Sequence, residues 1–340
     1  MRKLTHVWSL PLIIFLCFLV CALWLSHIMH QPGQQNSLIN YKVKSGQPLR
    51  SVLSGLHKVG VIQYPRLTEL WSRASGHYGQ VRVGHYEIPA QSSSLDVLEQ
   101  LNLGLVRLES ITIIEGSRYS DLIRSLTSHV SINKTLINVS KEEVMRRLGA
   151  PGVYPEGRFF PDTYHFAPGT SDFKLLSMAY KKMQRQLDAA WVNRAKGLPL
   201  KDPTQLLALA SIVEKETALA TERSKVAGVY ITRLRKGMYL QSDPTVIYGI
   251  GADYDGNIRR SDLQRDTPYN TYKRKGLPPT AVAMPGDDSL HAATHPDETG
   301  DIFFVANGTS DGSHYFSKTY VEHAAAVQRM ILRQRSRVIQ

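Results

Sequence analysis

The feature that most constrains this chain is an apolar run near its N-terminus, which extends from Val7 to Leu25. Its length is close to the roughly 20 apolar residues that cross a bilayer as a helix. Arg2 and Lys3 precede the run, and the first acidic residue of the chain is Glu69. By the positive-inside rule, this asymmetry predicts a single-pass anchor with a cytoplasmic N-terminus and the bulk of the chain across the membrane.

A cleaved signal peptide is the competing interpretation of the same run. The apolar core of such a peptide is usually about 7 to 15 residues long and is followed by a small-x-small cleavage site. The residues after Leu25 are Ser-His-Ile-Met-His, which contain no such site. Val20 precedes Cys21, at a position where a lipoprotein signal needs a small residue. An uncleaved anchor is therefore favoured.

Cysteine and charge counts exclude several classes of protein. Only Cys17 and Cys21 occur, both inside the apolar run, so the rest of the chain offers no disulfide scaffold, cysteine nucleophile or thiolate zinc site. The 41 Lys and Arg residues outnumber the 29 Asp and Glu residues, which gives a net charge of +12. Such a charge favours anionic partners such as phospholipid headgroups or carboxylate-bearing polymers. The predicted position outside the cytoplasm argues against nucleic acid as that partner.

Beyond the apolar run, the chain mixes helix and strand patterns throughout. We predict an α+β fold in three parts: a cytoplasmic tail and transmembrane anchor over 1–30, a linker and small module over 31–105, and a larger α+β domain over 106–340. The small module begins with a strand at Tyr41–Lys44, a turn and an apolar-spaced helix, which resembles a LysM-type glycan-binding module. A small α+β packing domain explains the same pattern equally well. The module is further predicted to contain a helix, a returning strand and a final helix, at Tyr64–Ala74, Gly84–Ile88 and Ser94–Leu103.

The sharpest chemical clue lies in a helix predicted from Asp202 to Thr217. Asp202 is a good N-cap, and a proline follows it at the first helical position. Leu209 and Ile212 precede Glu216 by seven and four residues, so at about 100° per residue all three share the apolar face. Burial disfavours the charged form of a carboxyl group and raises its pKa, as a general acid requires. We therefore select Glu216 as the candidate acid.

Two further interpretations concern the same helix end. A glutamate at a helix end can extend its carboxylate to water or pair with an arginine such as Arg223, in which case Glu216 is structural. Glu214 points to nearly the opposite side, alongside Leu207 and Ala210 and next to the solvent-compatible Lys215. The helical pattern alone leaves the acid and the structural interpretations of Glu216 open.

A second polar cluster follows in the segment 240–251. Asp243 is predicted to cap a short helix. This geometry gathers further polar side chains around the helix start, namely Gln241, Thr245 and Tyr248. Amide, hydroxyl and phenol groups can hydrogen-bond to sugars, and an aromatic face can pack on them. A capping role alone would also explain Asp243.

Several long motifs occur in one order along the chain. They are EGRFFPDTY at 156–164, ASIVEKET at 210–217, LQSDPTVIYGIG at 240–251, YNTY at 269–272, GLPPTAVAMPG at 276–286 and HP at 295–296. With these motifs the chain resembles the endolytic murein transglycosylases, the MltG (YceG-like) family, over essentially all its length. The resemblance implies a periplasmic enzyme, anchored in the inner membrane, whose YceG-like catalytic domain would occupy 106–340. It also implies that the second glutamate of EKE, Glu216, is catalytic.

The resemblance further implies a substrate and partners. The substrate would be peptidoglycan, with cleavage of the MurNAc–GlcNAc bond inside nascent glycan strands and formation of 1,6-anhydro-MurNAc ends. Peptidoglycan synthases (penicillin-binding proteins) would be partners, and the enzyme would act as a terminator of glycan polymerisation. No cofactor or metal is expected. The predicted substrate-binding residues are Gln241, Asp243, Thr245, Tyr248, Tyr269, Asn270, Tyr272 and His295.

Two histidines lie close together near the last motif. His291 and His295 have the four-residue spacing of a zinc-binding helix. Pro296 follows at once and no glutamate lies between the histidines, so we expect a loop rather than a metal site. His295 is expected to line the substrate groove, whereas His291 and Arg158 fall outside the family pattern and receive no role. Glu156 is expected to support the fold.

Two alternatives to a transglycosylase remain open. An ordinary glycosidase needs two carboxylates, and Asp243 would be the second one in a muramidase-type hydrolase. A lytic transglycosylase needs only one, because the C6 hydroxyl of the muramyl sugar attacks its own C1. The other alternative is a non-catalytic peptidoglycan-binding scaffold.

Overall fold

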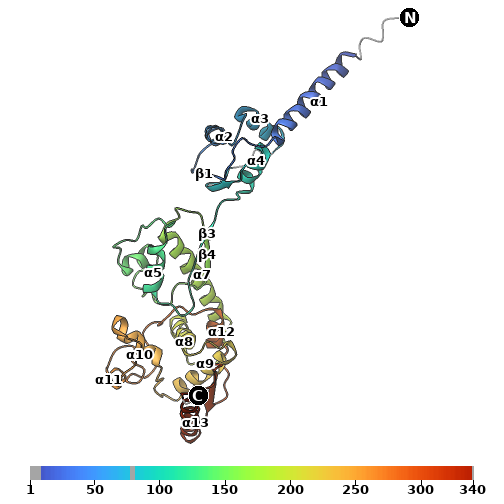
Figure 1. The fold of residues 1–340 in the computed structure, drawn as a ribbon. Coiled ribbons are helices and arrows are strands. Elements are labelled where there is room, and N and C mark those ends of the chain that lie inside the picture. The colour runs from blue at the N-terminus through green and yellow to red at the C-terminus, as the bar shows by residue number, and fades with distance from the viewer. Residues whose placement is uncertain (1–8, 77–80, 339–340) are drawn as a thin grey trace, which may run out of the picture. The chain divides into compact units, whose positions relative to one another are not determined.

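The computed structural model describes residues 9–76 and 81–338, which form helices and three two-stranded sheets. The chain divides into two compact units (Figure 1). Unit 1 comprises Met1–Glu109 with His165–Gly169, and unit 2 comprises Ser110–Tyr164 with Thr170–Gln340. Helix and sheet occur together along the chain, so the predicted α+β class is confirmed. The domain assignments with boundaries at 30 and 105 stay predictions.

The first helix, α1 (Ser9–His30), presents apolar side chains on all sides. Its segment Pro11–His30 is 20 residues long with a mean hydropathy of 2.6, so by length and composition it can cross a membrane. Phe15, Phe18 and Trp24 are each more than half exposed, so the described part of the chain leaves a large apolar surface of this helix uncovered. These features are consistent with single-pass anchoring. The first two residues of the predicted run, 7 and 8, lie outside the described residues.

Unit 1 packs helices against a two-stranded antiparallel sheet in which Ile39 lies opposite Ile88. The buried face of α2 carries Leu49, Val52 and Leu56, which share a core with both strands and with α4. The strands and helices predicted for this module are confirmed, whereas its LysM-like identity stays a prediction. In chain order the elements are β1 (Ile39–Val43), α2 (Leu49–Lys58), α3 (Pro65–Ala74), β2 (Gly84–Ile88) and α4 (Ser94–Leu103).

The elements that follow carry the candidate site. In chain order they are β3 (Glu109–Thr112), α5 (Tyr119–Ser128), α6 (Lys141–Arg147), β4 (Thr163–Phe166), α7 (Asp172–Val192), α8 (Pro203–Glu216), α9 (Ala220–Arg235), α10 (Asp243–Ile250), η1 (Gly251–Asp253), α11 (Arg260–Gln264), α12 (Asp287–Thr294), β5 (Phe303–Ala306), β6 (His314–Ser317) and α13 (Tyr320–Val338).

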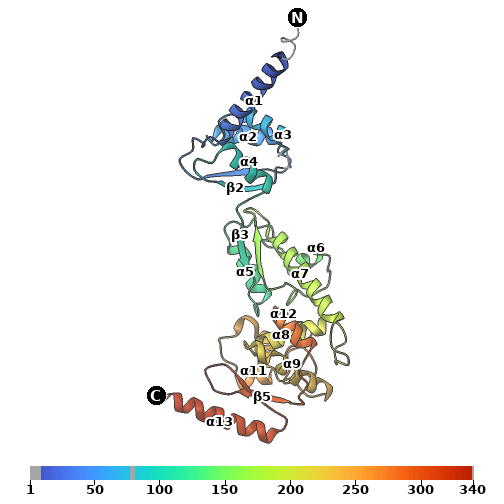
Figure 2. The same cartoon turned by 90° about the vertical axis from the view of Figure 1, so that its right-hand side faces the viewer.

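The core of unit 2 forms around α8, against which α7, α9 and α12 pack (Figure 2). All residues of α8 from Leu206 to Val213 are buried, so the helix is surrounded rather than buried on one face. The predicted one-sided burial is therefore wrong. The covering helices come from segments far apart in the chain, which the periodicity of a single helix cannot reveal.

Candidate active site

Glu216 is the last residue of α8, and local signals define both ends of this helix. The side chain of Asp202 accepts a hydrogen bond from the Gln205 N–H at 2.9 Å, so the predicted N-cap is confirmed. Thr217 leaves the helix in an extended conformation, with φ −143° and ψ 133°. The buried helix therefore holds the Glu216 side chain at the edge of the core.

One carboxyl oxygen of Glu216 accepts two hydroxyl donors. Oε1 accepts hydrogen bonds from the Tyr230 hydroxyl at 2.5 Å and from the Ser242 hydroxyl at 2.7 Å. Tyr230 belongs to α9, and Ser242 immediately precedes α10; both residues are buried. Oε2 has no hydrogen-bond partner in the part of the chain that the structure describes, so it is the oxygen left for a substrate.

The surroundings of Glu216 favour its neutral form. Burial raises the pKa of its carboxyl group and outweighs the two hydroxyl bonds, which lower it; the charge of Asp243 adds to the increase. Burial also raises the pKa of the Tyr230 phenol, which keeps that hydroxyl a donor. A neutral carboxyl group beside two donors can release a proton from Oε2 and then be stabilised as the carboxylate.

The neighbouring glutamate, Glu214, lies in a buried network of ion pairs and hydrogen bonds. Its side chain is only 5% exposed and lies 3.3 Å from the Arg223 guanidinium, and its second oxygen accepts the Gly286 N–H at 3.0 Å. Arg223 also lies 3.3 Å from Asp288. A distant segment, which includes Gly286 and Asp288, thus covers this side of α8. The arginine considered for Glu216 pairs with Glu214 instead.

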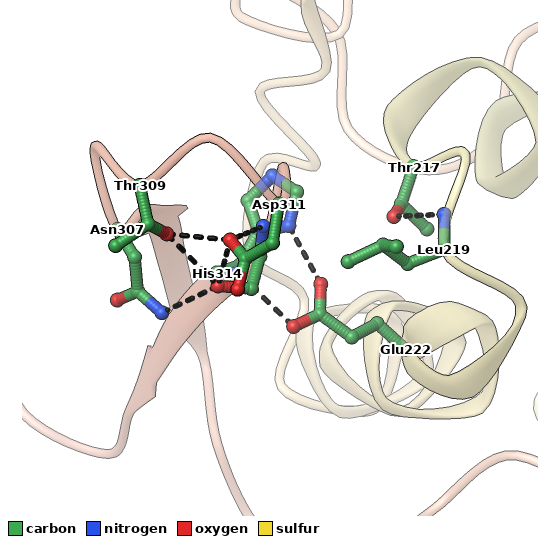
Figure 3. A network of polar contacts seen from close by, with 8 residues as sticks. Thr217, Leu219, Glu222, Asn307, Thr309, Asp311 and His314 are labelled. Carbon is green, nitrogen blue, oxygen red and sulfur yellow. Dashed lines mark hydrogen bonds and ion pairs between the residues drawn. The ribbon is translucent and has the colours of Figure 1, made fainter.

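A second polar network lies beside the end of α8 (Figure 3). On α9, Glu222 accepts the His314 backbone N–H at 3.0 Å, and its other oxygen lies 2.8 Å from Nδ1 of the same histidine. In the loop before β6, Asp311 accepts the Ser313 N–H at 3.0 Å. These contacts hold the His314 ring against α9.

The sequence patterns do not indicate that Tyr230, Ser242 or His314 lie near Glu216. Ser242 carries a usable signal, since it stands beside the Asp-Pro helix start inside the motif at 240–251. Tyr230 and His314 carry no such sequence signal, because the packing of a separate element brings each of them to this region.

The start of α10 differs from the predicted cap. Asp243 is the first helical residue, and Ser242 holds the N-cap position without a side-chain cap bond. The Asp243 carboxylate instead accepts the Tyr272 hydroxyl at 2.6 Å, so the predicted capping role is wrong. Gln241 is exposed and left-handed, with φ 52°. Asp243 and Tyr272 therefore bond to each other next to Ser242 in the chain, and Gln241 flanks Ser242 on its other side.

Two other predicted binding residues, Thr245 and Asn270, are buried. The Thr245 hydroxyl donates to the Ser242 carbonyl oxygen at 2.6 Å and lies 2.8 Å from the Thr271 hydroxyl. The Asn270 amide donates to three backbone carbonyls, those of Asp262, Leu263 and Arg265. These contacts position Ser242 and the loop around Asn270, and direct sugar contact by either side chain stays a prediction.

Tyr248 and Tyr269 belong to a separate cluster further along α10. Their rings lie 4.7 Å apart, and the Tyr248 hydroxyl donates to Glu156 at 3.1 Å. Glu156 is buried, and its other oxygen accepts the Tyr119 N–H at 2.9 Å, in agreement with the predicted supporting role. Both tyrosines and Glu156 line a cavity of about 780 Å³. Glu216 does not line this cavity, so the cavity and the candidate acid are distinct features of unit 2.

His295 is exposed and lies just beyond α12. His291 is helical, so the loop predicted for this pair is wrong at its first member. The two rings stack with centroids 4.7 Å apart, and no group of three or more metal-ligating side chains occurs in the described ranges. Among the described contacts none joins His295 to the Glu216 cluster, and its groove-lining role stays a prediction.

These observations define a class of protein: an α+β chain with an apolar N-terminal helix and, at the end of a buried helix, a carboxyl group whose pKa is raised. A family model described as YceG-like matches residues 41–329, so the chain belongs to the YceG-like family. The endolytic murein transglycosylase of Bacillus subtilis is 31% identical over 324 residues, which cover 88% of each chain. That of Streptococcus pneumoniae serotype 2 is 26% identical over 315 residues, which cover 83% of this chain and 56% of that protein.

The solved structures include a similar chain. The crystal structure of a yceG-like protein from Listeria monocytogenes covers 85% of this chain and 99% of its own, at 24% identity and a TM-score of 0.48.

Proposed function

We propose that this chain is an endolytic lytic transglycosylase that cleaves the MurNAc–GlcNAc bond inside murein glycan strands. The observation that carries the proposal is the carboxyl group of Glu216, which is held at one oxygen, favoured in its neutral form and available at the other oxygen. The names of the relatives from B. subtilis and S. pneumoniae support the same activity. Glu216 is the proposed catalytic residue.

One carboxyl group is sufficient for this chemistry. Neutral Glu216 donates its proton from Oε2 to the glycosidic oxygen as the bond from that oxygen to C1 breaks. The carboxylate, stabilised by the Tyr230 and Ser242 hydroxyls, then takes the proton of the muramyl C6 hydroxyl as its oxygen bonds to C1. The nucleophile belongs to the substrate, so the attack is intramolecular and gains the entropic advantage of a tethered group. The product is a 1,6-anhydro-MurNAc end.

A muramidase-type hydrolase is the second candidate, because the charge of Asp243 reaches Glu216 and raises its pKa. A hydrolase needs its second carboxylate free to activate water or to attack C1. The Asp243 carboxylate accepts the Tyr272 hydroxyl at 2.6 Å, which favours a supporting role for it.

Digestion of uncrosslinked glycan strands by the purified protein separates these two activities. We expect the new ends to be 1,6-anhydro-MurNAc, released from the interior of the strands, and mass analysis of the products measures this directly. Reducing MurNAc ends in their place would contradict the transglycosylase and support the hydrolase.

The hydroxyl donors on Glu216 predict a pH effect. Both hydrogen bonds stabilise the carboxylate, so their removal raises the pKa of Glu216 and keeps the acid protonated to higher pH. We expect Ser242→Ala to move the alkaline limb of the kcat/KM profile upward by about one pH unit, the scale of one charge-assisted hydrogen bond. Ser261→Ala, at an exposed position of α11, should leave the profile unchanged. A limb that moves to lower pH in Ser242→Ala would contradict the assignment.

We further propose that α1 anchors the chain in the inner membrane, with a cytoplasmic N-terminus and both units in the periplasm. Arg2 and Lys3 before the apolar run support this orientation. A reporter that functions only in the cytoplasm should be inactive when fused to the C-terminus, and an active one would refute the orientation.

From this position the enzyme would cut nascent strands as peptidoglycan synthases extend them and so terminate glycan polymerisation. Unit 1, with its predicted LysM-like module, would add a glycan contact. A non-catalytic scaffold remains the alternative, and undiminished function of Glu216→Gln in cells would favour it.

A further inference from the structure

The cavity beside Glu156 has no part in the chemistry derived above. Its volume is about 780 Å³, and its walls lie entirely in unit 2. They come from the start of α5, from the start of α6 with the segment 154–156, and from the end of α10 with the turn that follows. Five tyrosines and three cations line the cavity, the cations being Arg118, Arg124 and Lys141.

The two carboxyl groups that line the cavity are both engaged. Glu156 accepts the N–H and hydroxyl bonds described above, and burial raises its pKa although the charge of Arg118 lowers it. Asp121 accepts the Arg118 backbone N–H at 3.0 Å and lies 3.2 Å from the Arg124 guanidinium. Asp121 therefore offsets Arg124, and the three cations of the cavity outnumber its two carboxyl groups.

Arg118 and Lys141 form no ion pair within the described residues. The Arg118 guanidinium lies 5.3 Å from the centroid of the Tyr248 ring, and one N–H donates to the Ile247 carbonyl oxygen at 3.3 Å. The Lys141 ammonium lies 4.5 Å from the centroid of the Tyr154 ring and donates to its hydroxyl at 3.3 Å. Aromatic rings thus hold both cations in place without cancelling their charge.

We propose that this cavity binds the peptide stem of the glycan strand through the stem's carboxylates, with Arg118 and Lys141 as the cationic contacts. The inference rests on the proposed murein substrate, whose peptide stems carry carboxylate groups. A guanidinium presents a planar fork of donors that matches a carboxylate, and an ammonium adds a point charge. Neutral sugars carry no charge that could pair with the surplus cation, whereas the stem carboxylates do, so the charge of the cavity favours the stem.

Helix α10 connects the cavity to the candidate acid. Ser242, immediately before the helix, donates to Glu216, and Tyr248, near the other end, lines the cavity. At a rise of 1.5 Å per residue, these two positions lie about 9 Å apart along the helix axis. A strand with its reacting bond at Glu216 can therefore place a stem in the cavity within the same unit.

The test compares two substrates with full-length protein in detergent micelles. One substrate is uncrosslinked glycan strands with native stems, and the other is the same strands with the stem carboxylates converted to amides. We expect the wild type to show a kcat/KM about tenfold higher on native stems than on amidated ones. Amidation removes the negative charge of the stem, and with it the charge-assisted contacts to the cations. Lys141→Gln removes one of the two cationic contacts, so it should lose part of this factor on native stems, through a raised KM, and match the wild type on amidated ones.

Lys141 is exposed, so Lys141→Gln should fold normally, and Arg118→Gln is expected to show the same substrate-dependent loss. Lys181→Gln, an exposed position on α7 outside the cavity, is the matched control and should behave as the wild type. Equal losses on both substrates, or equal wild-type rates on them, would overturn the stem assignment.

A wild type that cleaves neither substrate would overturn the proposed function alone. Calorimetry then measures the binding of the free stem peptide to the protein, which requires no cleavage. Binding that Lys141→Gln weakens supports the assignment, and binding that it leaves unchanged overturns it.

Discussion

Glu216→Gln is expected to lower the turnover of glycan strands by a factor of about 10²–10⁴, the usual contribution of a general acid. Glutamine keeps the size of the side chain and an acceptor for the Tyr230 and Ser242 hydroxyls, so the variant should fold and bind substrate. It lacks the transferable proton that burial retains on Glu216. Quantification of anhydro ends over time measures the effect, after circular dichroism has verified the fold.

Glu214→Gln is the matched control for this experiment. It changes the same residue type two positions earlier, keeps an acceptor for the Gly286 N–H and leaves the carboxyl group of Glu216 in place. We expect a less stable protein that retains most of its activity when folded. The assignment of the acid would be refuted if Glu214→Gln were inactive and Glu216→Gln still released anhydro ends.

Arg223→Ala should destabilise unit 2 strongly. Arg223 is 8% exposed and lies between the carboxylates of Glu214 and Asp288, each 3.3 Å away. Its removal leaves the buried Glu214 carboxylate without a counter-charge, and the loss of one partner from a buried ion pair typically costs about 3–5 kcal/mol. We expect the free energy of unfolding, measured in urea, to fall by about 3 kcal/mol or more.

Arg274→Ala supplies the comparison for a surface ion pair. Arg274 lies 2.8 Å from Asp266, but both side chains are more than half exposed. Solvent screens such a pair, so its loss should change the free energy of unfolding by less than about 1 kcal/mol. A similar small change in Arg223→Ala would show that Glu214 does not depend on its arginine.

The sequence predicts the candidate acid better than it predicts the surroundings of that acid. Asp202 and the spacing of Leu209, Ile212 and Glu216 are local features, and they are sufficient to place a buried helix with a glutamate at its end. The same periodicity fails for Glu214, because segments far along the chain cover every side of α8. A helical pattern reports which residues are apolar and not how many neighbours surround the helix.

The partners of Glu216 show the same limit. Tyr230 and Ser242 reach Glu216 only through the return of α9 and the loop that follows it. His314 reaches its partner Glu222 only through a hairpin at the far end of the chain. Their positions depend on long-range packing, whereas sequence periods describe neighbours within one element. Asp243 illustrates the opposite error, since its side chain bonds Tyr272 in a different segment instead of the local cap position.

The late position of β6 has a consequence for the order in which the protein matures. β6 is among the last elements of unit 2 to be synthesised, and domains generally fold as units. Until β6 has been made, Glu222 lacks its backbone and imidazole partners on His314. A product truncated before β6 would therefore leave the Glu222 carboxylate beside the end of α8 without these contacts, although every residue of α8 and α9 is present.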